Sequence, residues 1–217
     1  MSIYVKQAGT WYEIPSGGGG LSGLGGWADI TAVTGNPTKH EYTDADGNDW
    51  TAYEWKGNGD VTTTEGIVNL FMIGGGSGTN LLAPGVWAEG SAGRVYDGYP
   101  IIAAGPHTVT VGGGGVPSDH LFAPNGSAGA GSKLGAITTG AASFGQMGAD
   151  ADVSLVTNAG WWKGWHSSIT GTDIEYGICQ PAGAGRPNRG DGTTALTTGV
   201  GTNGVVIVRV PRANAKV

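Results

Sequence analysis

Apolar residues along this chain gather in short runs that are rich in β-branched and aromatic side chains, which is typical of strands. The clearest runs are WTAYEW at 50–55, IVNLFMI at 67–73, HTVTV at 107–111 and VVIVRV at 205–210. The best helical candidate, 150–162, contains β-branched positions and is broken by Gly160. The pattern therefore predicts an all-β fold.

Two of these runs are almost continuously apolar, which is typical of strands that are buried on both faces. They are LFMI at 70–73 and VVIV at 205–208. We expect both to belong to one sheet system that holds the start and the end of the domain together.

Glycine is the second feature of the pattern, because 44 of the 217 residues are glycine, about three times the usual share of roughly 7%. Runs of it follow the apolar runs directly, at 74–76 and 112–115. Glycine lacks Cβ, so polyproline-II-like glycine segments can approach closely and hydrogen-bond side by side. We predict β-sandwich-like strands with a packed glycine-rich (polyglycine-II-like) layer. The alternative is that each run is an ordinary mobile loop.

The chain divides into three zones. Residues 1–14 alternate in polarity around the turn KQAGT and predict a short β-hairpin. Residues 15–26 are a Gly-rich linker by composition. Residues 27–217 form the glycine-rich β domain.

Charge and cysteine content narrow the choice of partners. The net charge is −6 and the eleven Lys and Arg residues are scattered, which argues against nucleic acid or anionic lipid as a partner. The single cysteine, Cys179, allows no intrachain disulfide. No stretch approaches the roughly 20 apolar residues of a membrane span, and the first residues lack the apolar segment of a signal peptide. We expect a soluble protein without membrane insertion.

Four motifs occur in an order that resembles the glycine-rich domain of tailed-bacteriophage tail fibre and minor tail proteins. They lie at 67–76, 107–115, 167–171 and 204–211. The resemblance spans roughly residues 50–211, although the middle is poorer in glycine than usual and Val210 stands where an aromatic residue is common. It implies a virion tail component that is made in the host cytoplasm. It also implies a homotrimer in which the glycine layer supports surface loops.

The N-terminal hairpin resembles the short Trp-containing hairpin that opens many phage tail proteins. This resemblance implies an attachment peptide, with Tyr4, Trp11 and Tyr12 contacting another tail protein. An ordinary edge hairpin is the alternative.

The strongest local signal for binding is AGWWKGWHSS at 159–168. Exposed aromatic rings beside polar groups suit the recognition of sugars. The candidate glycan-binding residues of this segment and of the loop 83–100 are Trp161, Trp162, Trp165, His166, Trp87 and Tyr96. The loop 183–192 is a third candidate for recognition. Packing beneath the glycine layer or at a trimer interface is the alternative for the tryptophans.

Catalytic or metal chemistry has little support in the sequence. The four histidines lie in separate contexts and no Gly-x-Ser-x-Gly motif occurs, so we expect neither an enzyme nor a cofactor. Asp44, Asp46 and Asn48 alternate like the first ligands of a calcium loop. The sixth position is Asp49 and the twelfth is Trp55, so a polar hairpin turn explains them equally well. The Arg-Gly-Asp tripeptide at 189–191 is best explained by chance in so glycine-rich a chain.

Two classes of function follow from these patterns. The first is a virion structural protein, a minor tail, tail-tip or tail-fibre component that contributes to adhesion to a host-surface glycan. The second is a free carbohydrate-binding (lectin-like) β module. The N-terminal hairpin and Gly linker favour the first class, because a free lectin needs no such anchor.

Overall fold

The computed structural model confirms the all-β class. It describes residues 3–7, 10–14, 26–78, 80–83, 86–88, 90–116, 128–140, 164–181, 186–194 and 200–217. Within these ranges the only helix is a short 3₁₀ turn, η1 (Arg212–Asn214). In the part of the chain that the structure describes, no helix is long and apolar enough to cross a membrane.

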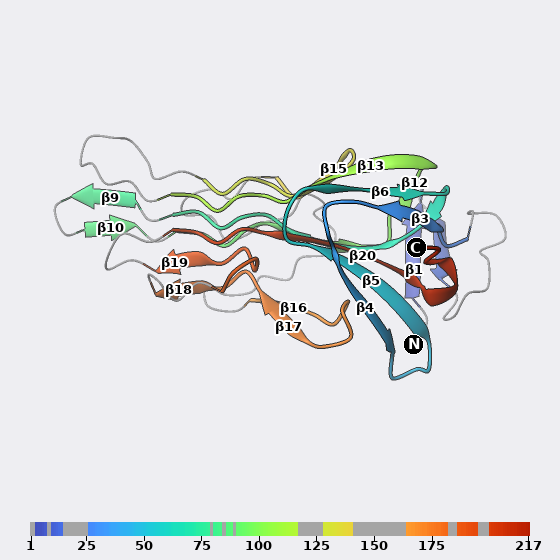
Figure 1. Ribbon diagram of the computed structural model, residues 1–217. Coiled ribbons are helices and arrows are strands. Elements are labelled where there is room, and N and C mark those ends of the chain that lie inside the picture. The colour runs from blue at the N-terminus through green and yellow to red at the C-terminus, as the bar shows by residue number, and fades with distance from the viewer. Residues whose placement is uncertain are drawn as a thin grey trace.

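Two five-stranded antiparallel sheets pack against each other as a β-sandwich (Figure 1). The first sheet contains, in spatial order, β11 (Val95–Gly98), β8 (Asn69–Ile73), β20 (Val205–Pro211), β5 (Asp49–Trp55) and β4 (Thr38–Thr43). The second sheet contains β15 (Ile137–Thr138), β14 (Lys133–Leu134), β13 (Gly105–Thr110), β6 (Gly59–Thr63) and β3 (Ile30–Val33). A short pair, β7 (Gly66–Ile67) with β12 (Ile101–Ile102), lies outside both sheets.

The two apolar runs belong to one sheet, as the sequence predicts, and the structure makes them neighbouring strands. β8 and β20 pair antiparallel, with Phe71 opposite Ile207. Successive side chains of a strand point to opposite faces, so each run supplies two cores. The inner core between the sheets contains Leu70, Met72, Val206 and Val208 together with Trp55, Val61 and Val109.

The outer core explains why these runs are apolar on both faces. It lies on the other face of the first sheet and contains Phe71, Ile73, Val205 and Ile207. A hairpin of β16 (Trp165–Ser167) and β17 (Ile174–Tyr176) covers it. The buried ring of Tyr176 packs 4.7 Å from the ring of Phe71, centroid to centroid.

Glycine-rich segments continue directly from the sandwich strands and run side by side (Figure 1). We call residues 74–78, 90–94, 111–116, 128–132, 190–192 and 200–204 the glycine bundle. At its far end in Figure 1 lie two short pairs: β9 (Asn80–Ala83) with β10 (Val86–Ala88), and β18 (Cys179–Pro181) with β19 (Gly192–Thr194). The C-terminus lies at the opposite, sandwich end.

Within the bundle, successive residues of the segment 74–77 donate hydrogen bonds to different neighbouring segments. The backbone N–H of Gly74 donates to Arg94 O, that of Gly75 to Ala130 O and that of Gly76 to Thr202 O, each at 2.9 Å. The N–H of Ser77 then returns to the strand of the first partner, at Ser91 O. This three-residue period is the period of a polyproline-II helix. The polyglycine-II-like layer as a whole stays a prediction.

Close approach of the backbones explains why glycine is needed in the bundle. A Cβ built at Gly75, Gly76, Gly93, Gly114 or Gly201 would lie closer than 3.0 Å to backbone atoms of a neighbouring segment. Real Cβ atoms do not come so near, and backbone atoms cannot rotate away as a side chain can. Glycine is therefore needed at these positions because the backbones of neighbouring segments pack closely, and not because the chain turns there.

The N-terminal hairpin pairs β1 (Ile3–Gln7) with β2 (Thr10–Ile14). Its register places Lys6 opposite Trp11 and Val5 opposite Tyr12. Residues 15–25 of the predicted linker lie outside the described residues. The role of the hairpin as a separate attachment peptide stays a prediction.

Candidate functional site

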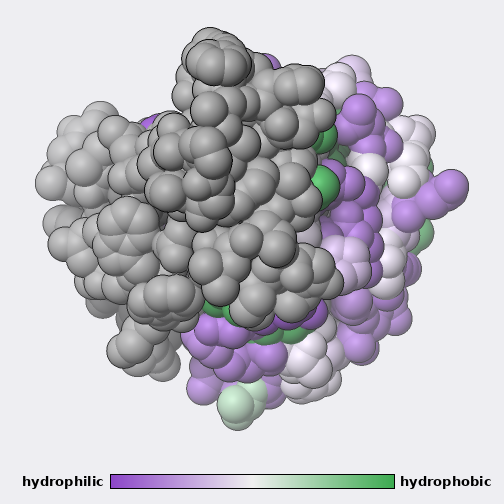
Figure 2. All heavy atoms as spheres, turned by 90° about the vertical axis from the view of Figure 1, so that its left-hand side faces the viewer, coloured by the Kyte–Doolittle hydropathy of each residue, from purple (hydrophilic) through white to green (hydrophobic). Residues whose placement is uncertain are grey.

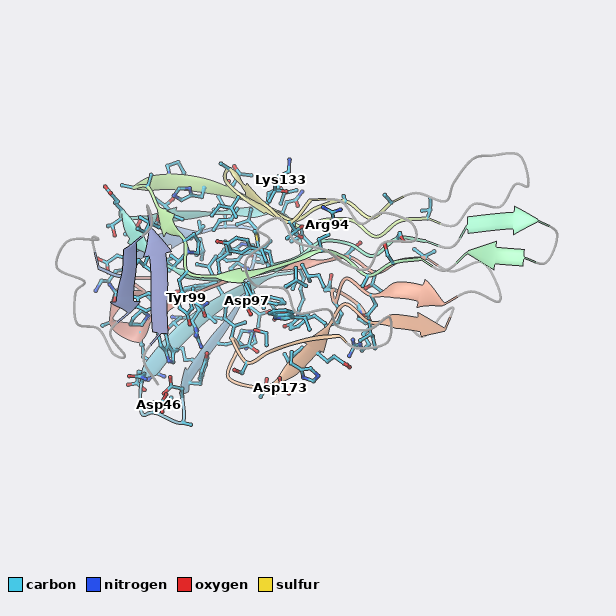
Figure 3. All side chains as sticks on the ribbon, turned by 180° about the vertical axis from the view of Figure 1, so that it is seen from behind. Asp46, Arg94, Asp97, Tyr99, Lys133 and Asp173 are labelled. Carbon is cyan, nitrogen blue, oxygen red and sulfur yellow. The ribbon has the colours of Figure 1, made fainter. Side chains whose placement is uncertain are left out.

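A pocket of about 220 Å³ opens on the outer face of the first sheet, beside β16. Its walls are made by residues of β8, β11, β16 and β20 and by the residues that follow β11 and β16. The lining residues are Asn69, Asp97, Tyr99, His166, Ser167, Ser168, Ile169 and Arg209. Figure 3 labels Asp97 and Tyr99 on the sandwich, well away from the β9–β10 end of the glycine bundle.

The pocket forms where the outer face of the sheet changes from apolar to polar. Along β8, Phe71 and Ile73 join the outer core, whereas Asn69 on the same face lines the pocket. Along β20, Ile207 lies in the outer core and Arg209 lines the pocket, opposite Asn69 in the register. The β16–β17 hairpin covers the apolar part, so the polar part remains as the pocket wall.

Asp97 is a half-buried carboxylate that faces a cationic side chain across the pocket. Trp165 Nε1 donates a hydrogen bond to Asp97 Oδ2 at 3.1 Å. Burial raises the pKa of Asp97, although the Trp165 hydrogen bond and the positive charge of Arg209 both oppose the increase. The carboxylate is therefore ionised less readily than an ordinary surface aspartate.

Arg209 is held firmly by two aromatic side chains. Its guanidinium carbon lies 4.3 Å from the ring centroid of Trp50, a cation–π arrangement. Its Nη1 donates to the hydroxyl of Tyr42 at 2.8 Å, and this hydroxyl donates in turn to Ile169 O at 2.8 Å. Arg209 Nε is buried without a partner among the described residues. The stacking on Trp50 and the hydrogen bond to Tyr42 therefore fix the position of the guanidinium at the pocket wall.

Two tyrosines near Arg209 remain hydroxyl donors at neutral pH. Burial raises the pKa of Tyr42 and of Tyr99, and the nearby charge of Arg209 only partly opposes this. The ring of Tyr99 packs edge-on against Trp27, with centroids 6.2 Å apart. Its position at the pocket wall is thereby fixed.

His166 forms the exposed rim of the pocket. Its Nδ1 lies 2.9 Å from Asp173 Oδ2, and its Nε2 lies 3.8 Å from Glu175 Oε1. The side chains of His166 and Asp173 are 60% and 66% exposed, so salt screens this pair and its contribution to stability is small. Asp173 is labelled in Figure 3 at the outer side of the β16–β17 hairpin.

The structure separates the residues that the sequence grouped as a glycan site. Trp165 and His166 lie at the pocket, but Trp165 also packs against the outer core. Tyr96 packs against the inner core, on the opposite face of the sheet from Asp97. Trp87 belongs to β10, whose backbone pairing alone is described. Trp161 and Trp162 lie outside the described residues, and contact of any of these residues with a glycan stays a prediction.

The proposed attachment residues lie in the N-terminal hairpin, for which only backbone pairing is described. Tyr4 is opposite Glu13, Tyr12 is opposite Val5 and Trp11 is opposite Lys6. Contact of these residues with another tail protein stays a prediction.

The calcium-like residues form the polar turn between β4 and β5. Asp44 Oδ1 accepts hydrogen bonds from the backbone N–H groups of Asp46 and Asn48, at 3.0 and 2.8 Å. Asp44 Oδ2 accepts one from Trp50 Nε1 at 2.6 Å. N–H donors occupy both oxygens, so the carboxylate caps a turn. In the described part of the chain there is no group of three or more His, Cys, Asp or Glu side chains suited to a metal ion.

We expect the Asp44 turn to make the protein less stable in acid. Burial raises the pKa of Asp44, but the hydrogen bonds from Trp50, Asn48 and Asp46 outweigh it and leave the pKa below its usual value. A lowered folded-state pKa gives stability that is present above the unfolded-state pKa and is lost as the pH falls through the folded-state pKa. Asp44→Asn should lower the melting temperature at pH 7 and flatten its fall between about pH 5 and pH 2.

The matched control is Asp46→Asn, because Asp46 is exposed and contributes only its backbone N–H to the turn. Melting curves of both variants across this pH range provide the measurement. Parallel curves for Asp44→Asn and Asp46→Asn would contradict the assignment of the acid-sensitive turn to Asp44.

The Arg-Gly-Asp tripeptide is part of the packed structure. Asp191 is fully buried, and Arg186 donates to its carboxylate from both Nε and Nη2, at 3.0 and 3.1 Å. Arg189 lies 5.0 Å from the ring centroid of Tyr176 and donates to Glu175 O. The buried aspartate is not available to a receptor, which agrees with the interpretation of the tripeptide as a chance occurrence.

Four residues of the pocket, Asn69, Asp97, Tyr99 and Arg209, are not among the predicted glycan-binding residues, although Asp97 and Tyr99 lie within the candidate loop 83–100. A signal for two of them is present, since Asn69 and Arg209 are the polar interruptions in the runs IVNLFMI and VVIVRV. A polar residue inside a buried strand is costly unless it is paired or serves a site. The chain matches no protein-family model, and no curated protein is significantly similar to it in sequence.

Proposed function

We propose that this protein is a structural component of a bacteriophage tail, placed at the tail tip or in a tail fibre, and that it contributes to host-surface adhesion. The observation that supports this best is the glycine bundle. Pairs of its segments leave the sandwich and return to it, and one such pair carries the β9–β10 hairpin at the far end (Figure 1).

A bundle of this kind suits the presentation of variable loops. Backbone-to-backbone hydrogen bonds join its segments, and side chains of the bundle's own residues add others, so its packing does not depend on the side chains of the connecting loops. Binding residues commonly lie on loops that a rigid scaffold positions. A receptor-binding tail protein needs this combination, because its loops have to change with the host while the rest of the virion stays the same.

Seen along the bundle toward the sandwich, the coloured residues at the rim are mostly hydrophilic or intermediate in hydropathy, with small hydrophobic areas between them (Figure 2). The homotrimer suggested by the family resemblance is part of the proposal. Three copies that bind together would convert weak single sites into stronger adhesion.

A free carbohydrate-binding module is the second candidate, and the polar pocket beside β16 favours it. Its lining includes a carboxylate, an amide and hydroxyl groups, which are common partners of sugars. The two candidates differ in where the protein is found, since a tail component belongs to the particle and a lectin does not.

Immunogold electron microscopy tests the proposal. Antibodies raised against the purified chain should label one end of the tail of purified phage particles. The same antibodies, after absorption with the purified protein, provide the control. Labelling of the particle-free fraction alone would contradict the virion role and favour the free module.

Light scattering of the purified protein should give about three times the chain mass of 21.8 kDa if the homotrimer forms without other tail proteins.

A further inference from the structure

The pocket on the sandwich is large enough for one small ring. Its volume of about 220 Å³ is below the roughly 300 Å³ at which pockets for drug-sized ligands begin. It lies on the side of the sandwich and not among the loops at the end of the glycine bundle. A ligand here would be a single unit of a larger molecule or a small free molecule.

Two hydrogen-bond acceptors in the pocket have no donor among the described residues. Trp165 occupies Asp97 Oδ2, and no described residue donates to Asp97 Oδ1. Asn69 is almost fully buried and uses its Nδ2 to donate to Gly98 O at 3.2 Å. Its Oδ1 accepts no hydrogen bond from the described residues. Two acceptors, an ionisable carboxylate oxygen and an amide oxygen, thus remain for a ligand.

Hydroxyl groups supply donors beside these acceptors. Ser168 is exposed at the pocket, and Tyr99 carries a phenolic hydroxyl there. A hydroxyl both donates and accepts a hydrogen bond. The pocket therefore matches a ligand whose groups can do both.

The charges of the pocket argue against an anion. Asp97 and Arg209 carry opposite charges and offset each other. Recognition of a carboxylate or phosphate uses the planar donor fork of arginine. In Arg209 this fork is partly occupied, because Nη1 donates to Tyr42 and the guanidinium also hydrogen-bonds Tyr99, while Nε is buried away from the pocket surface without a partner among the described residues. A neutral ligand avoids repulsion from Asp97 and does not need the fork.

We propose that this pocket binds one neutral sugar ring, with Asp97 and Asn69 accepting hydrogen bonds from ring hydroxyls and Ser168 and Tyr99 completing the contact. The inference rests on the adhesion part of the proposed function and names its ligand class. It places a sugar site on the side of the sandwich, separate from the loops at the end of the bundle.

Titration of the purified full-length protein tests the site. The probes are four neutral sugars: glucose, galactose, N-acetylglucosamine and rhamnose. Glucuronate, inorganic phosphate and zwitterionic alanine are the charged comparison ligands. Ligand-observed NMR measures the binding of each. At least one neutral sugar should bind with a Kd in the millimolar range, as is expected of a small open site. Binding of none of the four, or tighter binding of a charged probe, would overturn the proposal.

Two variants localise the binding. Asp97→Asn keeps an acceptor for Trp165 but removes the carboxylate, and it should weaken sugar binding about tenfold. Ser168→Ala removes one exposed hydroxyl and should weaken binding severalfold without affecting the fold. The control is Asp60→Asn, the same change on an exposed residue of the second sheet, and it should bind as the wild type does. Equal affinity of all three variants would overturn the proposal.

This experiment separates the site from the virion role. The titration uses the protein alone, so unlabelled tails with sugar binding would contradict the tail assignment and retain the site. Labelled tails without sugar binding would contradict the site and retain the tail assignment.

Discussion

Replacing Gly114 by alanine is expected to destabilise the protein by about 3 kcal/mol or more. The new Cβ would lie closer than 3.0 Å to the carbonyl oxygen and carbon of Gly201 and to the carbonyl carbon of Thr202. All three are backbone atoms, so relief requires the segments to move apart. That movement would also stretch the hydrogen bond from the N–H of Gly114 to the side chain of Asn203, which is 2.9 Å long.

The adjacent residue provides a matched control. A Cβ at Gly113 would meet nothing within 4 Å, and Gly113 is exposed. Gly113→Ala should therefore be close to neutral, or stabilising by up to about 1 kcal/mol because alanine restricts the unfolded chain. Urea unfolding of both variants measures the difference. Equal midpoints would mean that the segments of the bundle are not in close contact.

The strands of the sandwich were predictable because buried strands consist mainly of apolar residues, and such runs are visible in the sequence. β8 and β20 are nearly continuous apolar runs, and the structure places them in one sheet as expected, where they pair directly. The glycine bundle was predictable only in kind. Register between strands is set by side-chain pattern, and a run such as 112–115 has no side chains to set it. Its partners are determined by the sandwich strands to which each segment is joined.

The pocket was not predictable because its residues come from distant parts of the chain. Asn69, Asp97 and Arg209 converge only through the strand order β11–β8–β20, which sequence alone does not give. The sequence instead favours the tryptophan cluster as a binding site, because three tryptophans occur within five residues. Trp165 does reach the pocket, but through its hydrogen bond to Asp97 and its packing on the outer core.

A second large effect is expected at the buried ion pair beside the glycine bundle. Asp191 is fully buried and accepts four hydrogen bonds through its carboxylate. Two come from the guanidinium of Arg186, one from the backbone N–H of Arg186 and one from the backbone N–H of Ile178, at 3.0 to 3.1 Å. The hydrogen bond to Asp191 raises the pKa of Arg186, so the guanidinium stays charged at neutral pH.

The same residue belongs to the bundle through its backbone. The N–H of Asp191 donates to Thr202 Oγ1 at 2.7 Å, and its carbonyl accepts from the N–H of Thr202 at 2.9 Å. The ion pair therefore fixes one segment of the bundle to Arg186, which follows β18 in the chain. Removing it should loosen a boundary of the bundle as well as a local turn.

Asp191→Asn is expected to cost about 3–5 kcal/mol, because it leaves the half-buried guanidinium of Arg186 without its main partner and turns an amide toward N–H donors. The control is Asp173→Asn, which removes the same charge from an exposed side chain of the same region and should change stability by less than about 0.5 kcal/mol. Adding Arg186→Gln to Asp191→Asn should restore part of the loss, since the uncompensated charge disappears. Denaturant unfolding of the single and double variants gives this coupling directly. A double variant whose loss equals the sum of the two single losses would show that Arg186 and Asp191 stabilise the bundle independently and not as a pair.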